Sequence, residues 1–361
     1  MAVEKIVIVD TDSSQNPHYT SLNAAIIGES GGSPIIVTSS DLVANDEQLT
    51  IECRASSGAA DIANVVLAGF TTDATRLVKI RSLGNHRHNG VWDETKYRLE
   101  RQSGSAKDLM LISSVKDFII EGIQFHQLRP SEHNSGAIHI SNTNISWNGK
   151  IDSCIIRNTY VSDGSQAMAI NCYECASGSF LELINTIIYD FPSSTQYDGL
   201  GVGLGRSGWT VYCYNSTAYN CREGFFRYNG VLYCHNCISM ECTTQDFTNA
   251  SSSSSHNLSS DGTAPGSNSL INQVSTDVFV DHVNRDFRLK KTSEETSPAI
   301  DAGTDLSANM EAVDIANTPR PQGLAWDIGA FEYVDVSGAP MPIQFTAIGQ
   351  PGSVKWSWKR G

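Results

Sequence analysis

The chain has 361 residues and a formal net charge of −14 at pH 7, from 39 acidic and 25 basic residues. Apolar residues make up 40% and charged residues 18%, which excludes a disordered chain, because disorder requires few apolar residues and much charge. The acidic balance argues against a nucleic-acid partner, since this surface would repel phosphates. No apolar run approaches the roughly 20 residues that span a bilayer, so we expect no membrane span.

The first predicted elements are a strand and a short helix. Residues 1–10 alternate apolar and polar side chains, as a strand does, and do not resemble a secretory signal peptide. We therefore expect the protein to stay where it is made or to leave by a route other than the general secretory pathway. Residues 18–27 predict a helix with Thr20 or Ser21 as N-cap, placed to cover an open end of the fold.

Short strands dominate the rest of the chain. Apolar, β-branched segments lie at 35–37, 49–53, 65–67, 77–80 and 109–112, with a polar stretch at 81–105 that we expect to be a protruding loop. Two kinds of strand then alternate. We align the first kind on Ile138, Met168, Val202 and Phe226, and find the second at 121–126, 152–157, 185–190, 215–220 and 236–241. Recurrence every roughly 20–35 residues predicts a coil of parallel strands, each paired with its copy one turn later.

The pattern divides the chain into three parts: an N-terminal strand and cap (1–30), a parallel β-helix (31–333) and a C-terminal tail (334–361). Within the β-helix, residues 249–269 contain a run of serines and predict a flexible surface loop. The tail has two apolar strands with basic flanks, which suggests a docking segment or a simple cap. Its docking candidates are Phe345, Val354, Trp356 and Trp358.

Three phrases resemble right-handed parallel β-helix proteins of the pectate-lyase-like superfamily. They are the opening His18-Tyr-Thr-Ser-Leu-Asn-Ala-Ala25, the strand–turn–strand phrase Phe118-Ile-Ile-Glu-Gly-Ile-Gln-Phe125, and the closing Ser297-Pro-Ala-Ile-Asp-Ala-Gly303 with Asp327-Ile-Gly-Ala-Phe-Glu-Tyr333. Within that superfamily the chain is most similar to members encoded by tailed phages and marine bacteria, through 69–76, 88–93 and 257–266. The resemblance implies an all-β, right-handed parallel β-helix over about residues 1–333. It leaves activity open, because this coil carries lyases, hydrolases, epimerases, adhesins and virion parts.

The nine cysteines raise a metal or redox question. Cys172 and Cys175, and likewise Cys234 and Cys237, form Cys-x-x-Cys pairs, a spacing that also suits zinc. The repeat instead pairs Cys213 with Cys234, and Cys221 with Cys242, on adjacent coils. We therefore expect a buried stack of reduced thiols and no metal. Asn185, Asn215 and Asn236 share one register and predict a ladder of amides at a turn.

Outward positions of the first strand series are the candidate sugar contacts. Trp209, which we expect to be an exposed aromatic, is added to these positions. The glycan-binding candidates are His139, Asn171, Trp209, Arg227 and Asn229. The resemblance implies that a lyase of this fold would need a basic residue, commonly with Ca²⁺. The catalytic candidates are Arg157, Arg227, Asp163 and Asp198, none with diagnostic spacing. We expect no cofactor, with Ca²⁺ as the alternative.

The leading hypothesis is a phage virion protein, such as a capsid decoration, head spike or tail-spike-like subunit, that binds glycans and has no catalytic activity. Its expected partners are other virion subunits or further copies of itself in a homo-oligomer such as a trimer, together with surface polysaccharide. Its expected location is the virion, after synthesis in the host cytoplasm. The alternatives are a polysaccharide lyase or glycoside hydrolase of the β-helix type, and a bacterial surface adhesin located outside the cell.

Overall fold

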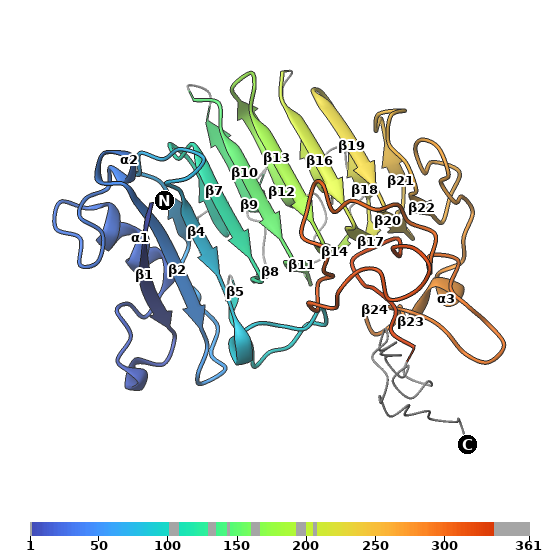
Figure 1. Ribbon diagram of the computed structural model, residues 1–361, viewed down its shortest axis with the longest axis horizontal. Helices are drawn as coiled ribbons and strands as arrows, with labels where there is room; N and C mark the ends of the chain where they lie inside the picture. The colour runs from blue at the N-terminus through green and yellow to red at the C-terminus, as the bar shows by residue number, and fades with distance from the viewer. Residues whose placement is uncertain are drawn as a thin grey trace, which may run out of the picture.

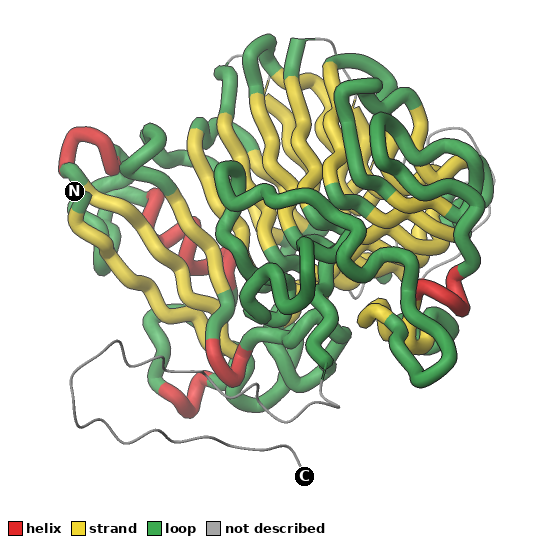
Figure 2. Tube along the Cα trace, turned by 45° about the vertical axis from the view of Figure 1, so that its right-hand side comes forward, coloured by secondary structure: helices red, strands yellow, loops and turns green. Residues whose placement is uncertain are grey.

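Three parallel sheets wind around one long core in a computed structural model of the chain (Figure 1). The structure describes residues 2–100, 108–128, 135–142, 145–159, 167–192, 200–204 and 208–335. From β4 (Val78–Arg81) to β21 (Gln245–Thr248) the chain visits the three sheets in the same order in every turn, and the strands lie side by side along the coil (Figure 2). The predicted all-β parallel β-helix is therefore confirmed. Among the described residues, no helix is long and apolar enough to cross a membrane.

Sheet A has eight strands and begins at the N-terminal end of the coil. Its members are β1 (Val3–Asp10), β2 (Glu47–Arg54), β4 (Val78–Arg81), β7 (Asp117–Glu121), β10 (Asn148–Asp152), β13 (Phe180–Ile184), β16 (Thr210–Tyr214) and β19 (Val231–His235). Alternate residues point into the core, so the sequence of each strand has the period of two that sheets require.

Sheets B and C have seven strands each. Sheet B comprises β5 (Arg98–Glu100), β8 (Gln124–Gln127), β11 (Ile155–Asn158), β14 (Ile187–Phe191), β17 (Thr217–Cys221), β20 (Ile238–Met240) and β22 (Leu258–Ser259). Sheet C comprises β3 (Val65–Leu67), β6 (Met110–Ile112), β9 (Ser135–Asn142), β12 (Ala167–Cys175), β15 (Leu200–Leu204), β18 (Glu223–Phe226) and β21 (Gln245–Thr248). Two stretches predicted to be loops thus contribute strands, since β5 lies within 81–105 and β22 within 249–269.

The remaining elements cap or decorate the coil. They are α1 (Leu22–Ser30), α2 (Leu42–Asn45), α3 (Ser275–Val278), the short 3₁₀ turns Ser13–Gln15 and Gly84–His86, and an antiparallel hairpin of β23 (Phe279–Asp281) and β24 (Asp286–Leu289). The predicted cap helix is confirmed: Ser21 is the N-cap of α1 and its hydroxyl accepts a hydrogen bond from the Ala24 amide at 3.2 Å. Leu22 and Ile26 of α1 are buried in the same cluster as the first strands, so the helix covers the core end that β1 would expose.

The strand register corrects the predicted alignment of the first series. Ile138 pairs with Ile170 rather than Met168, and Val202 pairs with Phe225 rather than Phe226. A two-residue slip keeps the same side chains inward, so alternation alone does not detect it. The one-residue slip has a visible consequence, because Phe225 is buried whereas Phe226 is only partly buried.

Most of the thiols and the indoles of Trp147 and Trp209 lie in the core. All nine cysteines are free, eight are buried, and Cys213 pairs with Cys234 on adjacent strands as predicted. The thiols of Cys221 and Cys242 also interact. Within the described ranges, no three His, Cys, Asp or Glu side chains are grouped so as to hold a metal ion. Trp209 is 1% exposed and its ring lies 6.1 Å from that of Trp147, so these indoles fill the coil.

A closing segment, residues 297–335, folds back over the turns between sheets A and B. Those turns place Asn185, Asn215 and Asn236 in the left-handed region, with φ of 46°, 45° and 54°. The Asn236 amide donates to Asn215 Oδ1 at 3.3 Å, which confirms that part of the ladder. Asn185 departs from it, because its amide donates to the Val313 carbonyl of the closing segment at 2.9 Å.

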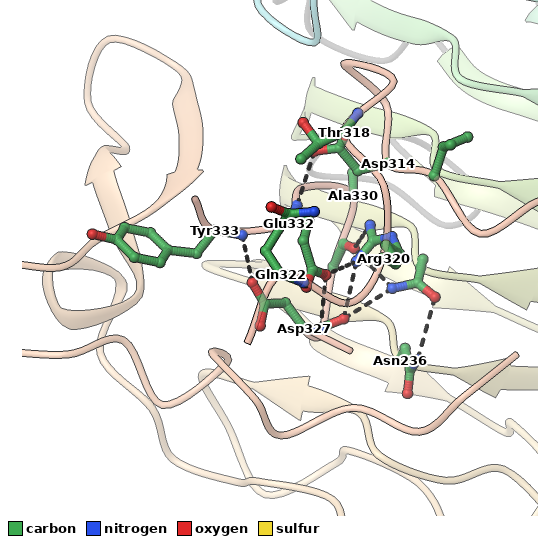
Figure 3. Close-up of polar contacts among 12 residues, drawn as sticks. Asn236, Asp314, Thr318, Arg320, Gln322, Asp327, Ala330, Glu332 and Tyr333 are labelled. Atoms are coloured by element: carbon green, nitrogen blue, oxygen red, sulfur yellow. Dashed lines mark hydrogen bonds and ion pairs between the residues drawn. The ribbon is translucent and has the colours of Figure 1, made fainter. Parts of the chain in front are cut away.

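Buried ionic contacts hold the closing segment together (Figure 3). Arg320 Nη1 lies 2.9 Å from Glu332 Oε2, and both side chains are fully buried. Arg320 also donates to the Gly329 carbonyl at 2.9 Å and to Asn185 Oδ1 at 3.4 Å. One guanidinium therefore joins the segment to itself and to the turns of the coil.

Candidate functional site

The outer face of sheet C carries a histidine oriented by an aspartate. His139 lies at the centre of β9, where it pairs with Leu111 on one side and with Asn171 on the other. Its Nδ1 lies 2.8 Å from Asp108 Oδ2, and Asp108 Oδ1 accepts from the Gly136 amide at 2.9 Å. The side chains of His139 and Asp108 are 15% and 11% exposed. The pair is therefore built into the sheet but reaches the surface.

The geometry determines how the imidazole is protonated. An ionised carboxylate can only accept, so Nδ1 carries the proton that is shared with Asp108. The lone pair of neutral His139 is then on Nε2, which is buried without a hydrogen-bond partner among the described residues. Such an imidazole can accept a hydrogen bond from a hydroxyl, because its other nitrogen is already bonded to the carboxylate.

Small side chains lie beside this histidine. Because side chains alternate along a strand, Ala137 and Ala169 point to the same face of sheet C as His139. Both are buried. Asn171, a predicted glycan contact, lies on the strand next to His139 but is only 2% exposed. It therefore contributes to the wall of the site more than to its open surface. Of the five predicted glycan contacts, the structure brings together His139 and Asn171.

The other glycan candidates lie elsewhere. The expectation that Trp209 is an exposed platform is wrong, because its indole is buried in the core. Arg227 follows β18, where it donates to the backbone carbonyls of Asn249 and Gly230. Asn229 lies in the turn between β18 and β19. Arg227 and Asn229 therefore lie beyond the end of β18. The alignment of the repeated strands had predicted Arg227 on the outer face of the strand.

Arg157, a predicted catalytic base, lies on the outer face of sheet B. Its guanidinium carbon is 3.7 Å from the Trp92 ring centroid, and its Nη2 is 2.7 Å from Glu94 Oε1. It also donates to His126 Nδ1 at 3.3 Å. Burial and the adjacent Arg157 charge lower the pKa of His126 to about 4. An anion and an aromatic face both stabilise the charged guanidinium, which opposes any role as a proton acceptor.

Several predicted residues lie outside the described part of the chain. These are the catalytic candidates Asp163 and Asp198 and the docking candidates Phe345, Val354, Trp356 and Trp358. Conversely, sequence reasoning missed Asp108. The signal for it is weak, because Asp108 precedes a strand one full coil before His139 and only the stacking of coils brings the two together.

Comparisons with known proteins add little to this geometry. No protein-family model matches the chain, and no curated protein matches it. Among solved structures, a crystal structure of the pectate lyase Pel9A matches with a TM-score of 0.37 and 14% sequence identity, over 92% of this chain and 97% of that chain. The assignment of a parallel β-helix therefore rests on the three parallel sheets themselves.

Proposed function

We propose that the protein is a polysaccharide-binding β-helix of a phage virion, and that the outer face of sheet C receives the sugar. The observation that carries the binding proposal is the His139–Asp108 pair, whose Nε2 has no hydrogen-bond partner within the described residues and can accept from a donor such as a sugar hydroxyl. A buried acceptor without a hydrogen-bond donor destabilises the protein by about 1–3 kcal/mol. A ligand that supplies the donor recovers this free energy on binding. The virion role is supported by the phage-like phrases in the sequence and by a stiff coil suited to display.

The binding proposal is tested on purified protein with an array of host capsular and surface polysaccharides, followed by calorimetry on any ligand found. We expect His139→Ala to weaken binding about tenfold or more. Val66→Ala is the matched control, because Val66 is exposed on the same sheet, in the same outward row and away from the pair. Unchanged affinity in His139→Ala, with circular dichroism like that of the wild type, would overturn the proposal.

The virion role needs a separate test. Mass spectrometry of purified phage particles from a host that carries the gene should find the chain, and particles without it would refute that role. Deleting residues 334–361 tests the expected docking tail: a truncated chain that still joins its particle or oligomer shows that the tail is not the docking segment.

A polysaccharide lyase or hydrolase is the second candidate function. It is favoured by the same pair, since a histidine oriented by a carboxylate is equipped to act as a general acid or base. Incubation with each bound polysaccharide should release new reducing ends if this candidate is correct. That release should then fall sharply in His139→Ala and in Asp108→Asn. Binding without release excludes it for those ligands.

A further inference from the structure

The outer face of sheet A contains a hollow of about 260 Å³ over β7, β10 and β13. Two rows of paired residues line it. One row runs from Ile119 through Lys150 to Glu182, and the other from Asp117 through Asn148 to Phe180. Because these strands are neighbours, each step along a row is about 4.8 Å. The hollow therefore spans three coils, with Ala74 and Leu77 of the loop before β4 also in its lining.

One wall of the hollow has a carboxylate with one oxygen that lacks a donor among the described residues. Asp117 is 3% exposed, and its Oδ1 accepts from the Asn148 amide at 3.0 Å. Its Oδ2 is buried and has no hydrogen-bond partner in the described part of the chain. Asp117 and Asn148 both line the hollow, so a hydroxyl bound there can donate to this carboxylate, which takes one side-chain hydrogen bond from Asn148. The missing partner is a donor.

The floor of the hollow is apolar on one side and charged on the other. The Phe180 ring is partly exposed and packs 5.3 Å from the Tyr212 ring, which in turn stacks on Tyr233 at 4.8 Å. Across from Phe180, Lys150 Nζ lies 3.5 Å from Glu182 Oε2. An aromatic face beside an amide, an ammonium group and carboxylates matches a pyranose ring, which has C–H groups on its faces and hydroxyls around its rim.

The charges of the site select among sugars. Lys150 is already paired with Glu182, so Asp117 leaves the hollow with an excess negative charge. The whole chain is also acidic, with a net charge of −14. A uronate or a phosphorylated sugar would meet repulsion here, whereas a neutral sugar would not.

We propose that this hollow binds one pyranose ring of a neutral polysaccharide, with Asp117 and Asn148 holding its hydroxyls and Phe180 its apolar face. The glycan chain continues along the coil axis towards Tyr212 and Tyr233. The hollow is on sheet A and His139 is on sheet C, so each site can be refuted without refuting the other.

The test uses the full chain with cellohexaose, maltohexaose and mannohexaose as neutral probes and a galacturonate hexamer as the charged comparison. Calorimetry and saturation-transfer NMR should detect at least one neutral probe. Asp117→Asn and Phe180→Ala should each weaken that binding about tenfold. Val66→Ala is the control, because Val66 is exposed on sheet C and does not line the hollow.

Four outcomes would overturn the proposal. They are no binding of any neutral probe, equal binding by wild type and both variants, tighter binding of the galacturonate hexamer, and self-association of the wild type that Phe180→Ala abolishes. The last result would show that a second copy of the chain covers this face. Asp117→Asn preserves the size of the side chain, so it keeps the test valid if Phe180→Ala fails to fold.

Discussion

The buried pair of Arg320 and Glu332 should stabilise the closing segment strongly. Both side chains are fully buried and their charged atoms lie 2.9 Å apart, while Glu332 Oε1 also accepts from the Gln322 amide at 2.8 Å (Figure 3). Arg320→Met removes the cation and leaves the carboxylate buried. Breaking such a pair from one side costs about 3–5 kcal/mol, because the remaining charge loses its counter-ion without regaining water.

Urea unfolding measures this loss, and limited proteolysis locates it, since residues 297–335 should become sensitive first. The double variant Arg320→Met with Glu332→Gln should recover a large part of the loss, because no buried charge remains. Burial raises the pKa of Glu332, so the carboxyl of the single variant gains a proton as pH falls and its deficit should be smaller at pH 5 than at pH 8. A single variant within about 1 kcal/mol of wild type at pH 8 would refute the reasoning.

The other predictions concern the ladder, a buried histidine and the thiols. Asn236→Ala should lower the free energy of unfolding in urea by about 2–3 kcal/mol, because both variants lose the hydrogen bonds to Thr304 and Asn215 and alanine is also strained at φ of 54°. Asn236→Gly should cost less, because glycine tolerates that φ. Equal losses would contradict a role for backbone strain. The pKa of His126 is lowered to about 4, below its usual value near 6.5, so its contribution to stability is complete above pH 6.5 and is lost as pH falls towards 4. His126→Gln should therefore flatten the fall in stability between pH 6.5 and 4, and an unchanged slope would argue against it. Thiol titration should label at most Cys242 in the native protein and nine cysteines after unfolding, since the other eight are buried; rapid labelling of several native thiols would contradict this packing.

How far the sequence predicts the site depends on the range of the contacts involved. His139 was placed on an outward face because alternation is local. Asp108 was missed because its contact with His139 depends on which coil lies next to which. Trp209 was misplaced because an indole near a strand end can turn into the core or out of it, and only the space beside Trp147 decides. The hollow above Asp117 needs three coils in register, which no single repeat specifies.

By itself the sequence determined the coil: its strands, its interleaved period, the capped helix at its start and the inward stacking of Cys213 on Cys234. These features are local or repeat at short intervals, so the pattern of side chains is sufficient to specify them. Only the tertiary structure decided the register between Ile138 and Ile170, because slips of two residues leave the same faces buried. It alone also placed Arg320 against Asn185, where a distant segment completes the hydrogen bonds of the turns. Contacts of that range follow from how the chain closes on itself, which the repeat does not encode.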